Sequence, residues 1–137
     1  MHHTKEKGDL GVLKAQLDLF NKGFTVCTPL TEHAPFDLVV CKDGTCKTIQ
    51  VKHRHLDRYG KFNVRFSNNH SDSNGTHTKE VNKELIDFYC VYCPETDLCY
   101  YFDPNKFNKH VSFRVIKSKN NQSQNINSAE DYLELKY

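Results

Sequence analysis

The sequence predicts an α/β protein of the α+β kind, with an N-terminal helix followed by a meander of β-strands. Apolar residues recur at helical spacing over residues 5–21, at Leu10, Leu13, Leu17 and Phe20. Short runs rich in β-branched and aromatic residues follow, bounded by turn residues. Two of these runs flank Asp43-Gly44, a pair typical of a two-residue type I′ hairpin turn. We therefore expect a single domain over residues 1–137.

Each element has its own local signal. Thr4 can cap the helix and Gly23 marks its end. Alternation or β-rich composition predicts strands at 24–28, 36–42, 45–52, 62–66, 86–93, 98–102 and 111–115. Residues 67–79 have no apolar content and are expected to form a long loop, which contacts DNA or is mobile. Residues 117–127 are expected to form a polar linker before a C-terminal helix at 128–135, capped by Ser128 and Asp131.

Charge is distributed unevenly along the chain. The formal net charge is only +2, but one segment, 47–65, is strongly basic. A basic segment of this kind suits phosphate binding. No apolar stretch approaches the ~20 residues of a membrane span, and no signal peptide opens the chain. We therefore expect an intracellular protein, cytoplasmic or nucleoid-associated, that is not secreted and has no membrane partner.

The predicted hairpin gathers three polar residues on one face. A two-residue turn at 43–44 sets Asp37 opposite Gln50. Because side chains alternate along a strand, Asp37, Gln50 and Lys52 emerge on one side. Directly opposed β-carbons lie roughly 5 Å apart and diagonal neighbours about 7–8 Å. A carboxylate, an amide oxygen and an ammonium therefore converge, either as a site or as an ordinary solvated face.

Pro35-Phe36-Asp37 followed by Gln50-Val51-Lys52 resembles the core of the PD-(D/E)xK nucleases, with Gln50 where that family usually has an acid. The wider pattern, with the runs 7–10, 32–37 and 92–97, is similar to the branch of small intron-associated and free-standing homing endonucleases. The resemblance extends over residues 4–103. It implies a restriction-endonuclease-like core, a central mixed β-sheet flanked by helices.

The resemblance also implies an activity and a site. The activity would be site-specific hydrolysis of double-stranded DNA, dependent on Mg²⁺ or Mn²⁺, by a homo-oligomer (a dimer or tetramer). Asp37 and Gln50 would bind the metal, and Lys52 would orient water and stabilise developing charge. The family supplies a further acid from its first helix, for which Asp9 is the candidate metal ligand and Glu6 the reserve. Related nucleases often carry this acid where the chain has Gly11 and Val12.

The expected DNA contacts fall into three groups of residues. The basic segment contributes Lys47, His53, Arg54, His55, Arg58, Lys61 and Arg65. The expected loop contributes Asn68, Asn69, His70, Asn74, Thr76, His77 and Lys79. The loop before the hairpin contributes Glu32 and His33.

Other functions stay open at this point. A nuclease scaffold that has lost an acid can serve as a non-catalytic DNA-binding module. A Holliday-junction-resolvase-like enzyme shares the core but recognises shape. An HNH-type nuclease using His70 and His77, and a host-interaction protein without DNA affinity, are further alternatives.

The six cysteines are expected to be mainly small buried hydrophobes. Cys90 and Cys93 lie on one predicted strand at an offset that sends them to opposite faces, a poor zinc geometry. Cys41 and Cys46 face each other across the hairpin, as possible ligands or a disulfide. An intracellular setting argues against the disulfide.

Overall fold

The computed structural model describes residues 4–72, 74–117 and 126–137, without the side chains of 67–72 and 76–80. The chain begins with helix α1 (Thr4–Asn21) and continues mainly as strands. The strands are β1 (Thr25–Cys27), β2 (Leu38–Lys42), β3 (Thr45–His53), β4 (Lys61–Arg65), β5 (Ser67–Asp72), β6 (Gly75–Glu80), β7 (Phe88–Cys93), β8 (Leu98–Phe102), β9 (His110–Arg114) and β10 (Asn127–Ser128). Three short 3₁₀ helices are η1 (Lys83–Leu85), η2 (Pro104–Lys106) and η3 (Ala129–Tyr132).

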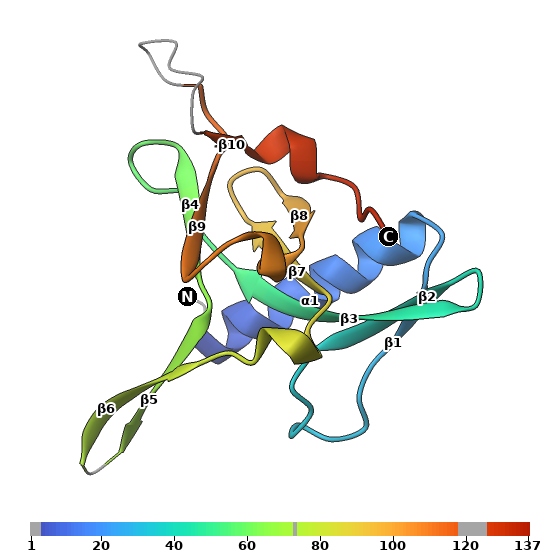
Figure 1. The fold of residues 1–137 in the computed structure, drawn as a ribbon. Helices are drawn as coiled ribbons and strands as arrows, with labels where there is room; N and C mark the ends of the chain where they lie inside the picture. Colours follow the sequence, from blue (N-terminus) through green and yellow to red (C-terminus); the bar gives the residue numbers. More distant parts are fainter. Residues whose placement is uncertain (1–3, 73, 118–125) are drawn as a thin grey trace.

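A five-stranded sheet in the order β1-β2-β3-β7-β8 forms the centre of the molecule (Figure 1). Its neighbours are antiparallel except β3 and β7, which run parallel, so the sheet is mixed. A second, three-stranded sheet has the order β10-β9-β4. Strands β5 and β6 pair only with each other, and their hairpin extends away from the body in Figure 1.

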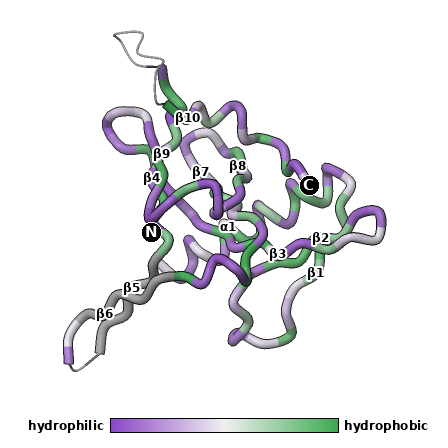
Figure 2. The backbone as a smooth tube through the Cα atoms, in the orientation of Figure 1, coloured by the Kyte–Doolittle hydropathy of each residue, from purple (hydrophilic) through white to green (hydrophobic). Residues whose placement is uncertain are grey.

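Two apolar cores lie on the two faces of the central sheet. Helix α1 closes the first core, which includes Ile49 and Val51 of β3. The β4–β9 pair closes the second with a cluster of aromatic rings that includes Phe62 and Phe113. Strand β7 contributes to both cores and is therefore an almost unbroken apolar run. Figure 2 shows the hydrophobic segments gathered where these layers meet. The predicted fold class, an N-terminal helix with a central mixed sheet, is confirmed, and the second face is covered by the β10-β9-β4 sheet.

Helix α1 packs with a different face from the one expected. Its buried residues are Gly11, Ala15 and Leu19. A β-carbon at Gly11 would lie 3.5 Å from Cγ1 of Val51, so the small residue allows the helix to approach β3 closely. Three residues of the expected stripe are left outside, with exposed fractions of 62%, 57% and 71% at Leu13, Leu17 and Phe20, whereas Leu10 packs against the core. The prediction of this stripe as the core face was wrong because the neighbouring face, which carries Gly11, is the one that approaches β3.

The hairpin register agrees with the sequence prediction. Cys41 pairs with Cys46 and Leu38 with Ile49, which leaves Asp43-Gly44 as the turn. Both turn residues have positive φ, 51° and 77°, as a type I′ turn requires. Cys41 and Cys46 form a disulfide, which the expected intracellular setting had disfavoured.

Three segments need correction or lie partly outside the description. The expected loop 67–79 is largely the β5–β6 hairpin, in which His70 pairs with His77. Most of the expected linker 117–127, namely 118–125, lies outside the described residues. The expected C-terminal α-helix is only η3, preceded by β10, and the side chain of Ser128 makes no capping hydrogen bond.

Among the described residues, no helix is long and apolar enough to cross a membrane.

Candidate active site

Asp37, Gln50 and Lys52 come together at the N-terminal end of β2, where this strand begins beside β3. The Asp37 amide donates to the carbonyl oxygen of Ile49 (2.9 Å), which continues the hairpin register by one residue. Its carboxylate oxygen Oδ2 accepts a hydrogen bond from the amide of Val51 (2.8 Å). Since Ile49 and Val51 point into the core beneath α1, Gln50 and Lys52 emerge on the opposite face. We call these three residues the catalytic patch.

Burial opposes charge on both ionisable residues of the catalytic patch. Desolvation raises the pKa of Asp37 above its ordinary value, and this outweighs the Val51 hydrogen bond and the attraction of Lys52. Desolvation likewise lowers the pKa of Lys52, with help from Arg54, against the attraction of Asp37. No direct ion pair joins the two residues. A cation beside Asp37 and an anion beside Lys52 would each favour the charged form of that residue.

Tyr89 and Arg54 lie beside the patch. Arg54 was expected only as a DNA contact, and Tyr89 was not singled out from the sequence. Tyr89 is the β7 partner of Gln50 in the sheet, and its hydroxyl is buried without a hydrogen-bond partner among the described residues. Burial raises its pKa to about 12, with Arg54 lowering and Asp37 raising it, so both groups lie near the phenol. Arg54 donates to the carbonyl oxygens of Asn63 (3.2 Å) and His53 (2.9 Å). Tyr89 was hidden in a continuous β run, where periodicity does not distinguish the two faces.

The predicted helix acids Asp9 and Glu6 lie at the exposed N-terminal end of α1. Asp9 and Glu6 are exposed on α1, and Asp9 lies on the same outward face as Leu13 and Leu17. No described contact links Asp9 to Asp37 or Lys52. Val12, at a position where related nucleases often have the acid, packs against the core beneath α1. Asp9 as a third metal ligand therefore stays a prediction.

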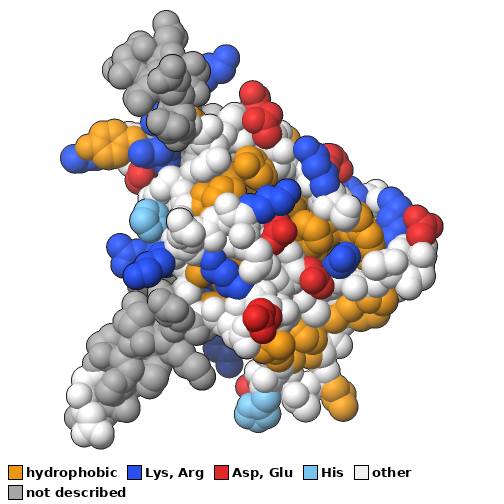
Figure 3. All heavy atoms as spheres, viewed as in Figure 1, with side chains coloured by type: hydrophobic (Ala, Val, Ile, Leu, Met, Phe, Trp, Pro, Cys, Tyr) orange, Lys and Arg blue, Asp and Glu red, His pale blue; other side chains and the backbone are white. Residues whose placement is uncertain are grey.

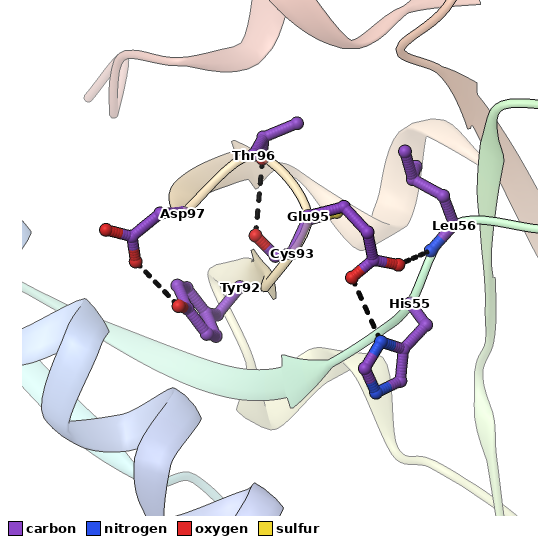
Figure 4. Close-up of polar contacts among 7 residues, drawn as sticks. All are labelled: His55, Leu56, Tyr92, Cys93, Glu95, Thr96 and Asp97. Atoms are coloured by element: carbon purple, nitrogen blue, oxygen red, sulfur yellow. Dashed lines mark hydrogen bonds and ion pairs between the residues drawn. The ribbon is translucent and has the colours of Figure 1, made fainter.

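The basic segment does not form one surface. Lys47 lies on the same face of β3 as Ile49, which is the α1 side of the sheet. Its Nζ is 5.9 Å from the centroid of the Tyr137 ring. His53 lies on that side too, since a β-carbon at Gly11 would be 3.6 Å from its Cβ. His55 Nδ1 lies 3.0 Å from Oε2 of Glu95 (Figure 4).

This contact belongs to the turn after β7, which is anchored at both ends. Glu95 also accepts from the Leu56 amide, at 2.5 Å, and the Tyr92 hydroxyl donates to Asp97, at 2.6 Å (Figure 4). The 92–97 run of the sequence therefore fastens the chain that leaves β3. His55 has a structural partner there, and Glu95 is held by two donors.

The remaining predicted DNA contacts are spread over four places. Arg58 and Lys61 border a small hollow of about 420 Å³ together with Arg114 and Lys117. Arg65 borders a larger hollow at the far end of β4. Glu32 and His33 are exposed before β2. The predicted hairpin contacts lie on β5, β6 and their turn; Asn74 is exposed, and the side chains outside the description are Asn68, Asn69, His70, Thr76, His77 and Lys79.

The catalytic patch offers oxygen ligands of the type that Mg²⁺ and Mn²⁺ prefer. Oδ1 of Asp37 has no hydrogen-bond partner among the described residues, and Gln50 adds a neutral amide oxygen. Mg²⁺ is commonly held by one or two carboxylates, with waters and substrate phosphates completing its shell. The donor set therefore fits such an ion, with one protein carboxylate. Among the described residues, no group of three or more His, Cys, Asp or Glu side chains could hold a metal, which gives no support to a zinc site.

A helix packed on a mixed sheet, with aspartate, glutamine and lysine converging from two neighbouring strands, is the arrangement of a nuclease core. The model of the PD-(D/E)XK endonuclease family matches residues 2–135, so the chain belongs to this family.

Two solved structures are similar to the chain, and the first of them shares its fold. The bacterial homing endonuclease I-Ssp6803I superimposes with a TM-score of 0.77 at 21% identity, over 96% of this chain and 88% of that one. Hjc, a Holliday junction resolvase of the archaeal hyperthermophile Archaeoglobus fulgidus, has a TM-score of 0.49 at 14% identity, over 77% and 82%. None of the curated proteins matches the chain.

Proposed function

We propose that the protein is a divalent-metal-dependent endonuclease that hydrolyses phosphodiester bonds of double-stranded DNA at specific sites, as a homing endonuclease does. The observation that carries this is the convergence of Asp37, Gln50 and Lys52 on one face of β3, with Asp37 held by the Val51 amide. Family membership and the fold shared with a bacterial homing endonuclease support it.

The metal would be held by Asp37 and Gln50. Bound there, Mg²⁺ or Mn²⁺ polarises the phosphate and makes water a stronger nucleophile. The hydrogen bond from Val51 holds Oδ2 of Asp37, so Oδ1 is the oxygen left for the ion. Gln50 supplies an oxygen without a charge, so this set carries one negative charge fewer than an aspartate–glutamate pair.

Lys52 is the group that acts on the phosphate. Its position beside Asp37 allows it to orient the attacking water and to stabilise negative charge as the bond breaks. A half-buried ammonium is effective here because little water screens its charge. Arg54, anchored by two carbonyl oxygens, adds positive potential at the same place.

Cutting both strands requires a second copy, because one such site cuts one strand. A homo-oligomer is therefore part of the proposal, with a two-fold pair as its minimum. The exposed stripe of Leu13, Leu17 and Phe20 on α1 is apolar surface that a second copy can cover. Sedimentation of the wild type and of Leu17→Glu tests this: we expect the wild type to be larger than a monomer and the variant to dissociate.

Plasmid cleavage tests the catalytic proposal. Supercoiled DNA that carries a candidate target is incubated with the protein in Mg²⁺, in Mn²⁺ and in EDTA. We expect nicked or linear product with either metal and none in EDTA. Plasmid that stays intact under all three conditions, on every target tested, would overturn the proposal that the protein is an endonuclease.

The second candidate is a DNA-binding module that keeps the nuclease scaffold without cutting. It is favoured by Gln50 and Val12, which stand where acids are usual, and by the single carboxylate in the catalytic patch. A gel shift at several salt concentrations decides between the two. Salt-dependent binding with intact plasmid indicates the module.

A further inference from the structure

A second positively charged region lies away from the catalytic patch, where the β5–β6 hairpin joins the body. It is an open hollow of about 1260 Å³ between the end of β4, the segment after β6 and the segment that leads into β9. Figure 3 shows Lys and Arg side chains next to the grey atoms of the hairpin. Five basic residues line this hollow, which we call the basal hollow: Arg65, Lys83, Lys106, Lys109 and His110.

The fold itself brings these residues together from three segments. Arg65 and His110 are paired across β4 and β9, and the Phe66 amide donates to the carbonyl oxygen of Lys109 (3.0 Å). Lys83, on η1, has its Nζ 4.1 Å from the Phe66 ring centroid and donates to the carbonyl oxygen of Phe107 (2.7 Å) and to that of Asn108. Lys83 therefore has a structural role. It holds segment 107–108 near the Phe66 ring, which forms the floor of the basal hollow.

The other cations have no such partner. None of Arg65, Lys106 and Lys109 forms an ion pair with a described residue, and none of the described residues that line the hollow is acidic. Like charges placed together repel one another unless an anion lies between them. In a chain with a net charge of only +2, this concentration points to an anionic ligand.

The position of the basal hollow indicates which anion. The Phe66 ring at its floor packs edge-on against Tyr89, with centroids 5.1 Å apart, and Tyr89 is the sheet neighbour of Gln50. One aromatic wall thus separates the hollow from the catalytic patch. The hollow is also flanked by the two ends of the β5–β6 hairpin, since Phe66 and Val81 both line it. A duplex lying on the patch can continue into the hollow along the foot of the hairpin.

We propose that the basal hollow binds backbone phosphates of the DNA duplex beside the cut, with Arg65, Lys106, Lys109 and His110 as the contacts. The proposal rests on the proposed function for the choice of DNA as the ligand. It adds an anchoring surface that takes no part in bond cleavage. Because phosphates carry no sequence information, the contact positions the duplex without selecting its sequence.

Duplex binding measured against salt tests the proposal. The probe is a fluorescently labelled duplex of mixed sequence, because phosphate contacts need no target, and anisotropy is recorded in EDTA so that nothing is cut. Each phosphate contact contributes about 0.9 to the slope of log K against log salt concentration. We expect the double variant Lys106→Gln/Lys109→Gln to bind more weakly and to lose about 2 from that slope.

The matched control removes the same charge elsewhere. Lys5 and Lys136 are exposed and do not line the hollow, so Lys5→Gln/Lys136→Gln should keep the wild-type slope. Melting curves of both variants check that each is folded. Equal slopes for the two double variants overturn the proposal, as does a wild type without duplex affinity.

The outcome separates this proposal from the catalytic one. If the wild type leaves plasmid uncut while Lys106→Gln/Lys109→Gln loses slope relative to the control, the anchoring surface stands and the enzyme proposal fails. If the wild type cuts plasmid while both double variants bind alike, the anchoring surface fails and the enzyme proposal stands.

Discussion

The two faces of β3 have different roles, although the residues of the two faces alternate along the same strand. Ile49 and Val51 lie beneath α1, at 0% and 8% exposure, and contribute to the core. Gln50 and Lys52 emerge on the other face, where burial disfavours the charge of Lys52. Every second residue therefore supports folding, and those between support the proposed chemistry. Substitutions at neighbouring positions of β3 are therefore expected to have opposite effects. At one position the cleavage rate falls while the fold is kept, and at the next the free energy of unfolding falls while cleavage continues.

The largest effect is expected from the charged residues of the catalytic patch. Asp37→Ala and Lys52→Ala should each lower the cleavage rate by about 100-fold or more while the fold is kept, because each removes a charge that acts on the phosphate or the metal. Plasmid cleavage and circular dichroism measure the two properties. Lys136→Ala, which removes the same charge at an exposed position that is not an expected DNA contact, is the control and should retain cleavage. An unfolded Asp37→Ala protein would mark Asp37 as structural.

The opposite signature is expected at Ile49. Ile49→Ala should lower the free energy of unfolding by about 2–5 kcal/mol, because it leaves a cavity in the core beneath α1. Urea unfolding measures this change. At a temperature where the variant is folded, plasmid cleavage should continue. Loss of cleavage in fully folded Ile49→Ala would show that the two faces are not independent.

A smaller effect depends on pH. Burial lowers the pKa of Lys52, so the unfolded chain binds the proton more tightly than the folded one. The cost of this charge to folding is complete below the lowered pKa and disappears as pH rises to the ordinary value of 10.5. Lys52→Met should therefore raise the melting temperature at neutral pH, by an amount that shrinks toward pH 10.5. Lys136→Met, at an exposed position, should show no such trend.

The smallest effect concerns two buried phenols. Tyr89→Phe removes a hydroxyl without a described partner, so the free energy of unfolding should stay the same or rise by about 1 kcal/mol. Tyr100→Phe removes a hydroxyl that donates to Thr96 Oγ1 (3.1 Å) and should lower it by about 1 kcal/mol. Urea unfolding of both variants measures the difference. A clear loss of stability in Tyr89→Phe would mean that its hydroxyl has a partner after all.

Local signals allowed much of this structure to be predicted. The hairpin around residues 43–44 depends on two adjacent residues, and with it came the register that joins Asp37, Gln50 and Lys52. Strands β7, β8 and β9 also followed from composition and turns. Failures occurred where the outcome depends on distant partners. The sequence of α1 shows which residues are apolar, but not that the face with Gly11 is the one that packs closely on β3.

The same limit applies to the candidate sites. Residues 67–79 are polar throughout, yet cross-strand backbone pairing of β5 with β6 forms a hairpin there. The basal hollow combines Arg65, at the end of the basic segment 47–65, with Lys83 and with Lys106, Lys109 and His110, which are distant from it in the sequence. Tyr89 joins the catalytic patch only through its parallel pairing with Gln50, a non-local contact. Spacing within one segment predicts neighbours on that segment and no others.

The turn at Asp43-Gly44 lies at the end of the hairpin remote from the catalytic patch, yet its length determines what that patch contains. Adding or deleting one residue there would shift the pairing of β3 with β2 by one residue. The side chains of β3 would then exchange faces. Isoleucine and valine would then face the substrate, while glutamine and lysine would be driven under the helix. An insertion in this bend should be as harmful as replacing Asp37 itself, even though the bend lies at the opposite end of the hairpin from that residue.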